Sequence, residues 1–280
     1  MTSDIFISRG INKRTCEDAA GYVNNVFWVI DGASVPQNLD SEKYNAKWLV
    51  DHFNKFLHFY FRNSPTIELN IALREAIKHI KSLIPLPYQQ AEILPSATLA
   101  ILRVNVDTVD YVIIGDCSIT LKSAGESNTI SDLRLQNFGQ EIRNDAMELI
   151  KKGYSFKSPE LKSLIEKLVL EERSHMNRVG GYWVISISEE AVDHCISGSI
   201  NHCKLFDILL YTDGFGRLVT KYGRFSNDEK LIKSVKENGI IYNINLLRQI
   251  EEQDKLGQKY PRTSFSDDAT CIFLTNEKNI

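Results

Sequence analysis

Several carboxylate side chains of this sequence stand where an apolar, β-rich segment begins or ends. They follow such a segment at Asp31, Asp116 and Asp213, and they precede one at Glu17, Asp18, Asp267 and Asp268. Because the ends of neighbouring strands meet at one edge of a sheet, these side chains can gather in one place. Four or more carboxylates at close quarters repel one another strongly unless cations neutralise them. The pattern therefore predicts a cation site built from carboxylates.

The donor types in this pattern indicate which cation would bind. Oxygen ligands without His or Cys favour hard ions, so Mg²⁺ or Mn²⁺ is expected rather than Zn²⁺. The glycine after Asp31 lets the backbone approach closely, which makes the carbonyl of Gly32 a further candidate ligand. A single Asp-Gly pair indicates a hairpin turn before it indicates a ligand. The repetition of the pattern along the chain is what favours a metal site.

The elements that must position these residues begin with a hairpin. An Asn24-Asn25 pair interrupts the apolar residues between Gly21 and Asp31, which predicts a two-residue turn. The second arm is continuously apolar, so we expect it to be a buried central strand that delivers Asp31. A second hairpin is predicted over 98–106 and 109–114. Further strands are expected at 5–7, 182–187, 206–211 and 269–274.

Helical periodicity appears between these strands. Leu49, Phe53 and Leu57 recur on one face of a first helix. A second helix is predicted to start at Ser64, as N-cap, with Pro65 in its first turn. Further helices are expected within 137–172, where Ser158-Pro159 is another start signal, and over about 228–253.

The strands come mostly as hairpins, which favours antiparallel sheets covered by helices over a doubly wound parallel sheet. The chain has 280 residues, of which 43% are apolar and 25% charged, the usual balance for a globular protein. It contains no internal repeat, low-complexity tract or linker. We therefore expect one domain over residues 1–280.

Charge and cysteine usage narrow the function classes. The net charge of −3 comes without a basic face, so nucleic acid is not expected as a partner. No apolar run reaches the roughly 18 residues of a membrane span. The five cysteines are scattered, odd in number and without a CxxC pair; they are Cys16, Cys117, Cys195, Cys203 and Cys271. Such thiols are typical of a reducing compartment. Since the first residues also lack a secretory signal, we expect a cytoplasmic protein.

Six short motifs, taken in order, resemble those of the protein phosphatase 2C (PPM) family of metal-dependent serine/threonine phosphatases. They are Glu17-Asp18-Ala19, Asp31-Gly32, Ser96-Ala97-Thr98, Gly115-Asp116-Cys117, Thr212-Asp213-Gly214 and Asp267-Asp268-Ala269-Thr270. The resemblance runs from about Ser8 to Leu274. It implies an α+β fold of two packed antiparallel β-sheets flanked by helical layers, an α-β-β-α sandwich.

The resemblance also implies roles for the acidic residues. Asp31 would bridge two Mg²⁺ or Mn²⁺ ions, and the Gly32 carbonyl would bind one of them. Asp213 and Asp267 would complete the protein ligands of the other ion. A water bridging the two ions, acidified to hydroxide, would attack phosphorus in line. Asp31 and Asp213 are thus the implied catalytic carboxylates.

Three further carboxylates have implied supporting roles. Glu17 and Asp18 would hold metal-bound waters, and Asp116 would help Asp213 bind a third, weaker ion. A region at about 133–182 lies where related phosphatases carry a variable flap, so we expect a helical flap there, with ordinary helical packing as the alternative.

Family members grip the substrate phosphate with an arginine that precedes the Glu-Asp pair. Here Lys13 has the expected spacing, and Arg14 lies one residue later. We favour Arg14, because a planar guanidinium suits two-pronged phosphate contact, and we keep Lys13 as a candidate. The family's His after Asp-Gly is replaced by Ala33-Ser34, so the leaving group must receive its proton from another source, such as a metal-bound water.

These features predict a monomeric phosphomonoester hydrolase that acts on phosphoserine or phosphothreonine in proteins, with a kinase as a candidate partner. Two alternatives remain. One is a catalytically weak or inactive phosphatase-like binding or regulatory module, which the missing His favours. The other is a phosphatase of small phosphorylated metabolites, which the same residues would serve equally well.

Overall fold

The computed structural model describes residues 2–33, 35–36, 41, 43–91, 93–123, 126–201 and 205–276. Within these residues, ten strands form two five-stranded antiparallel sheets, with strand orders β1-β10-β9-β6-β7 and β2-β3-β4-β5-β8. The strands are β1 (Thr2–Ser8), β2 (Ala19–Val23), β3 (Val26–Gly32), β4 (Ala97–Val104), β5 (Thr108–Ile114), β6 (Ser118–Ser123), β7 (Ser127–Ser131), β8 (Ile196–Asn201), β9 (Leu205–Tyr211) and β10 (Ala269–Thr275).

The two sheets pack face to face around a shared apolar core. Val29 and Ile113 of one sheet meet Leu210 and Ile272 of the other in a fully buried cluster. Successive side chains of a strand point to opposite faces, so each of these residues has neighbours on the outer face of its sheet. Those outer faces are also apolar, and helices cover them.

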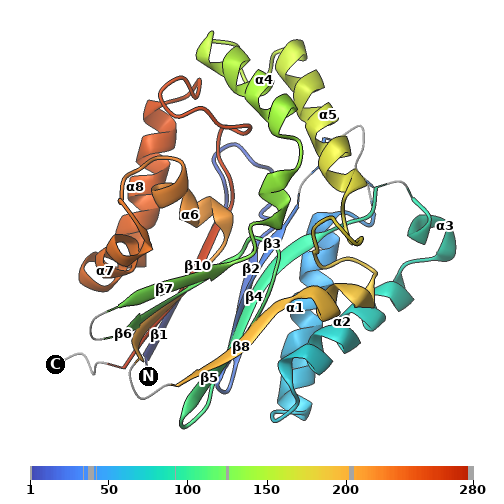
Figure 1. The fold of residues 1–280 in the computed structure, drawn as a ribbon, viewed down its shortest axis with the longest axis vertical. Coiled ribbons are helices and arrows are strands. Elements are labelled where there is room, and N and C mark those ends of the chain that lie inside the picture. The colour runs from blue at the N-terminus through green and yellow to red at the C-terminus, as the bar shows by residue number, and fades with distance from the viewer. Residues whose placement is uncertain are drawn as a thin grey trace.

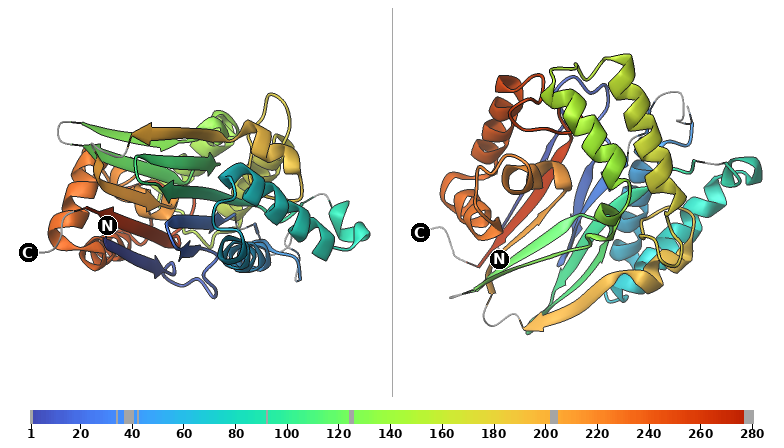
Figure 2. Two further views of the ribbon diagram at one scale, coloured as in Figure 1. Left: turned by 90° about the horizontal axis from the view of Figure 1, so that it is seen from below. Right: turned by 45° about the horizontal axis from the view of Figure 1, so that its top comes forward.

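Helical layers close the sandwich on both sides (Figure 1). Trp28 on the outer face of β3 packs against Leu49 and Phe53 of α1. This second covered face explains why β3 is continuously apolar instead of alternating. On the other sheet, Phe273 packs against Phe215 of α6. The helices are α1 (Ala46–Asn63) and α2 (Leu69–Leu83) on one side, and α6 (Asp213–Thr220), α7 (Asp228–Asn238) and α8 (Ile240–Gln253) on the other. The predicted α-β-β-α sandwich is confirmed, and its layers are visible in Figure 2.

Two further helices stand together at one end of the sandwich (Figure 1). They are α4 (Gln140–Lys151) and α5 (Pro159–Ser174), preceded by the 3₁₀ turn η1 (Arg134–Asn137). Ala146, Ile150 and Leu161 form a small core of their own between them. This pair occupies the region in which a helical flap was predicted. The short helix α3 (Leu86–Gln89) and the turn η2 (Glu189–His194) complete the helical elements of the described residues.

Some predicted boundaries were wrong. Ser64 does not start the second helix; its backbone N–H donates to Tyr60 O and ends α1, and α2 begins only at Leu69. Residues 182–187 form no strand, although Ile185 makes an isolated bridge with Ala97. The helix expected over 228–253 is divided at Gly239, where the backbone has a φ of 83°.

The cysteines that the structure describes, Cys16, Cys117, Cys195 and Cys271, are free thiols. Cys203 and Ser34, which were discussed above, lie outside the described residues. Within the part of the chain that is described, no helix is long and apolar enough to cross a membrane.

Candidate active site

The strand ends that carry the predicted carboxylates meet at one edge of the sandwich. Asp31 is the penultimate residue of β3, and Asp116 follows β5 after Gly115. Asp213 is the first residue of α6, directly after β9, and Asp267 precedes β10. All four line one cavity of about 820 Å³. The structure thus brings these four predicted residues together.

Backbone geometry fixes the loop that carries Asp31. The N–H of Gly32 donates to Glu17 O over 3.2 Å, and the N–H of Ala33 donates to Ser96 O over 2.9 Å. A Cβ at Gly32 would lie 2.8 Å from Glu17 O, which is too close for any larger residue. Glycine is therefore required here by close packing against the Glu17 loop, and it also lines the cavity.

Burial and neighbouring carboxylates raise the pKa of three of the four cavity carboxylates, Asp31, Asp116 and Asp213. Burial and the charges of Asp18 and Asp213 raise the pKa of Asp31 well above its ordinary value. Burial and Asp213 raise the pKa of Asp116 to about 7. Burial and the charge of Asp267 raise the pKa of Asp213, although Arg217 opposes the shift. Buried carboxylates that raise one another's pKa lack compensating positive charge.

Asp18 lies deeper than these four residues. Its Oδ2 accepts a 2.9 Å hydrogen bond from the Thr212 hydroxyl. Its Oδ1 and the Thr270 hydroxyl are buried and make no hydrogen bond of normal geometry within the described residues. Burial and the nearby Asp268 raise the pKa of Asp18 to about 8, although the Thr270 hydroxyl opposes the shift. A buried carboxylate oxygen without a partner is costly, and a cation would satisfy it.

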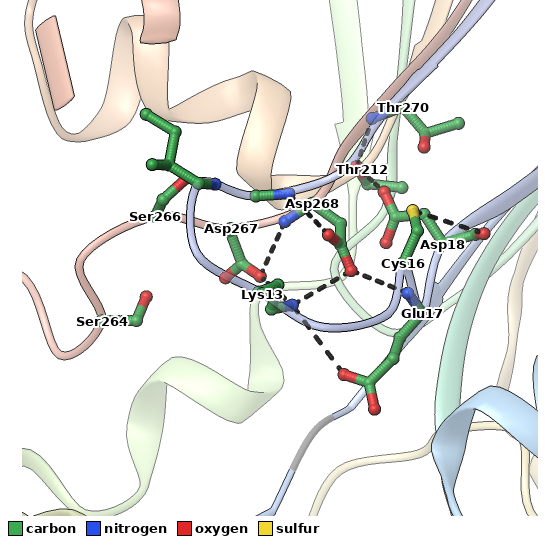
Figure 3. A network of polar contacts seen from close by, with 12 residues as sticks. Lys13, Cys16, Glu17, Asp18, Thr212, Ser264, Ser266, Asp267, Asp268 and Thr270 are labelled. Carbon is green, nitrogen blue, oxygen red and sulfur yellow. Dashed lines mark hydrogen bonds and ion pairs between the residues drawn. The ribbon is translucent and has the colours of Figure 1, made fainter. Parts of the chain in front are cut away.

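Asp268 ties the loop of residues 10–17 to the start of β10 (Figure 3). Its Oδ1 accepts from the N–H of Gly10 over 2.8 Å, and its Oδ2 accepts from the N–H of Glu17 over 2.7 Å. The side chain is only 2% exposed. These bonds hold Glu17 and Lys13 beside the cavity, so Asp268 has a positioning role that the sequence pattern did not distinguish from that of Asp267.

Lys13, and not Arg14, reaches the cavity. The Lys13 ammonium lies 2.9 Å from Asp267 Oδ1, 3.1 Å from Asp268 Oδ2 and 3.8 Å from Glu17 Oε2 (Figure 3). Although burial opposes it, Asp267 raises the pKa of Lys13 above its ordinary value. Arg14 is exposed and is not among the residues that line the cavity. Our preference for Arg14 as the residue that grips phosphate therefore finds no support in this geometry.

Arg217 is a site residue that the sequence reasoning missed. It lies one turn after Asp213 in α6, and its Nη2 is 2.5 Å from Asp267 Oδ2. Although burial opposes the shift, Arg217 and Lys13 hold the pKa of Asp267 below its ordinary value. Recognition of a helix that begins at Asp213 would have revealed it, because residues four apart share a helix face.

Helix α5 forms one wall of the cavity. Lys162, Ile165 and Val169 line it from one face of this helix. Arg173, at the end of the same face, donates to Ala33 O over 3.0 Å and to Leu94 O over 2.7 Å. Helix α5 is thus fastened to the loop that follows Asp31.

The residues present fit a divalent cation by their chemistry. The donors are all oxygens, neighbouring carboxylates help to raise the pKa of Asp31 and Asp116, and one buried oxygen of Asp18 has no hydrogen-bond partner among the described residues. Even so, no three His, Cys, Asp or Glu side chains of the described residues converge closely enough to enclose one ion.

Comparison with known proteins identifies the fold. No protein-family profile matches the chain, and no curated protein matches it in sequence. Solved structures do match. A bacterial serine phosphatase is similar with a TM-score of 0.57 and 18% identity, over 100% of this chain and 99% of that one. The catalytic domain of the serine/threonine protein phosphatase PstP, in complex with two manganese ions, is similar with a TM-score of 0.55 and 15% identity, over 97% and 96% of the chains.

A third similar structure is the PPM Ser-Thr phosphatase MsPP from Mycobacterium smegmatis in complex with cacodylate. Its TM-score is 0.54 and its identity 15%, over 98% of both chains. The chain therefore has the fold of the PPM serine/threonine phosphatases, and the resemblance noted in the sequence is confirmed at the level of the fold.

Proposed function

We propose that the protein is a metal-dependent phosphomonoester hydrolase that acts on phosphoserine or phosphothreonine in proteins. The observation that carries this proposal is the cluster of Asp31, Asp116, Asp213 and Asp267 in one cavity, at the edge of a PPM-type sandwich. The neighbour PstP, which carries two manganese ions, supports a divalent metal.

In this proposal Asp31 would serve both ions, the Gly32 carbonyl would hold one of them, and Asp213 and Asp267 would complete the protein ligands of the other. Asp116 would help Asp213 hold a third. Bound divalent ions supply Lewis acidity that activates water and neutralises charge on phosphoryl oxygens. Mg²⁺ and Mn²⁺ both suit this oxygen donor set.

The chain's own residues would shape the site and position the substrate in it. Asp18, buried behind the cavity and hydrogen-bonded to Thr212, fixes the inner wall of the site. Lys13 lines the cavity beside Asp267, and we assign to it the contact with a phosphate oxygen. The α5 wall would cover the substrate and exclude bulk water, which strengthens electrostatic contacts inside the cavity. No histidine lines the cavity among the described residues, so protonation of the leaving group falls to a water.

A binding or regulatory module without turnover is the second candidate. It differs from the proposal in the role of Asp267, whose two oxygens each contact a protein cation, Lys13 and Arg217, and would in a module keep these contacts alone. A phosphatase of small metabolites would use the same carboxylates. A cytoplasmic location and a monomeric state stay predictions.

Hydrolysis of para-nitrophenyl phosphate by the purified protein tests the proposal. We expect turnover with Mn²⁺ or Mg²⁺, none in excess chelator, and a loss of at least about 100-fold in Asp31→Asn. A phosphoserine peptide and a sugar phosphate, compared under the same conditions, separate protein from metabolite substrates. Folded protein that is inactive with both ions would favour the module, and a fully active Asp31→Asn would refute the site assignment.

A further inference from the structure

The cavity that holds the strand-end carboxylates extends well beyond them. Its volume of about 820 Å³ lies in the upper part of the roughly 300–1,000 Å³ range of pockets that take whole ligands. A phosphate group with its ions would fill only the end at Asp31 and Asp213. The remaining lining is therefore available to contact the rest of the substrate.

Much of that remaining lining is aliphatic. It comes from α5, from η1, from the loop that follows β3 and from one further segment; these residues are Val35, Pro36, Leu135, Ile165, Val169 and Val184. Val169 and Leu135 belong to none of the apolar clusters that the described residues form. Packing of the core therefore does not account for these two side chains.

The charged residues that α5 adds to the lining cancel in pairs. Lys162 and Glu166 have opposite signs, and so have Glu172 and Arg173. Charge therefore gives this wall no preference for an acidic or a basic ligand. A sugar or a nucleoside would place hydroxyl groups against the aliphatic side chains, where their hydrogen bonds to water are lost without replacement. An aliphatic side chain loses no hydrogen bond there and is removed from water.

Position along α5 indicates how far each side chain lies from the reacting phosphate. Arg173 marks the inner end of the helix, because it donates to the carbonyl of Ala33, which closely follows Asp31. At ~1.5 Å per residue, Val169 lies ~6 Å and Ile165 ~12 Å farther along the helix axis. An extended peptide spans about 3.3–3.6 Å per residue, so side chains about two to three positions from the phosphorylated residue reach this stretch of α5.

We propose that the protein acts on phosphoproteins in which an aliphatic side chain, about two to three residues from the phosphoserine or phosphothreonine, packs against Val169 and Ile165. This inference deepens the proposed function and rests on it. Val169 is then a specificity-determining residue, because it contacts the substrate away from the reacting phosphate.

Hydrolysis of phosphoserine peptides by the full chain with Mn²⁺ tests the inference. Leucine is moved through the positions on each side of phosphoserine, in a peptide otherwise made of alanine and glycine. We expect leucine about two or three residues away, on at least one side, to raise kcat/KM at least about fivefold over the peptide without leucine. In Val169→Ser that gain should fall below about twofold, while the peptide without leucine is hydrolysed as by the wild type. Leu170→Ser, which changes a 41% exposed leucine of α5 outside the cavity, is the matched control and should keep the gain.

Equal hydrolysis of all the peptides, or a gain that Val169→Ser leaves intact, would overturn the inference and leave the phosphatase activity in place. A sugar phosphate hydrolysed as fast as the best leucine peptide would overturn it as well. If circular dichroism shows that Val169→Ser is unfolded, Val169→Thr replaces it. Its hydroxyl stands in place of a methyl group, so the gain should fall at least about twofold, and an unchanged gain would overturn the inference. Wild-type protein that hydrolyses no phosphoester with either ion would remove the proposed function and this inference with it.

Discussion

Replacement of Asp18 by asparagine should stabilise the metal-free protein at neutral pH. Asp18 is buried, its Oδ1 makes no hydrogen bond within the described residues, and burial and the charge of Asp268 raise its pKa to about 8. An acid whose pKa is higher in the folded than in the unfolded state favours folding at low pH. That contribution is fully present below the unfolded pKa of 3.8 and is lost as pH rises through 8.

The size of the effect follows from the same shift. At pH 7 Asp18 carries a proton in the folded protein and none in the unfolded chain. At about 1.4 kcal/mol per pH unit above 3.8, this difference lowers the free energy of unfolding by roughly 4 kcal/mol relative to acid pH. Asparagine does not titrate, but one of its N–H groups would lack an acceptor, which costs about 1–3 kcal/mol. The variant should gain roughly 1–3 kcal/mol, or about 2–10 °C in Tm.

Thermal unfolding in excess chelator, at pH 5 and at pH 7.5, measures this difference. Asp18→Asn should melt above the wild type at pH 7.5, and the gap should shrink at pH 5. Asp145→Asn, at an exposed position of α4, is the matched control and should leave Tm unchanged. If Asp18→Asn melts at or below the wild type at pH 7.5, the carboxylates do not repel one another as argued. Added Mn²⁺ should raise the Tm of the wild type more than that of the variant.

Three further substitutions test neighbouring parts of the site by hydrolysis of para-nitrophenyl phosphate with Mn²⁺. Lys13→Ala should lower kcat/KM at least about tenfold, whereas Arg14→Ala should change it less than about twofold. A larger loss in Arg14→Ala than in Lys13→Ala would restore Arg14 as the phosphate ligand. Arg173→Met removes the hydrogen bonds to Ala33 O and Leu94 O. It should therefore lower Tm by several degrees and raise KM more than it lowers kcat. An unchanged KM would show that α5 does not position the loop that follows Asp31. Cys117→Ser should keep full activity, because burial raises the pKa of this thiol well above its ordinary value and excludes a nucleophilic role; a tenfold loss would contradict that.

Local signals predicted the hairpins and the carboxylates at their ends. The Asn24-Asn25 turn is present, with Asn24 at a φ of 54°, and β3 delivers Asp31 as expected. Such features depend on a few adjacent residues, so they can be read from one sequence. The convergence of Asp116, Asp213 and Asp267 on one cavity followed from the same reasoning about strand ends.

Features that depend on tertiary contacts could not be predicted in this way. Strands β7 and β8 were missed because they are short and partly exposed, with mostly serine, threonine, asparagine or glycine in place of a clear apolar alternation. Strand β6 was missed because its buried alternation is limited to two apolar residues, Ile119 and Leu121. The start of α2 was misplaced because Ser64 and Pro65 carry an N-cap signal that the end of α1 uses instead.

The choice between Lys13 and Arg14 shows the same limit within the site. Chemistry alone favoured the guanidinium, whereas the loop held by Asp268 turns Lys13 toward the cavity and leaves Arg14 exposed. Arg217 was not predicted as a site residue, because its partner Asp267 is 50 residues away in the sequence. Ion pairs between distant segments leave no periodic signal.

The central claim is that the carboxylates at this edge of the sandwich hold divalent cations. The most direct measurement is an anomalous difference map from crystals of the protein grown with Mn²⁺. We predict two strong peaks, one in contact with Asp31 and the Gly32 carbonyl and one in contact with Asp31, Asp213 and Asp267. A map without a peak at these side chains, from protein that hydrolyses phosphate esters only when Mn²⁺ is present, would contradict the account of the site.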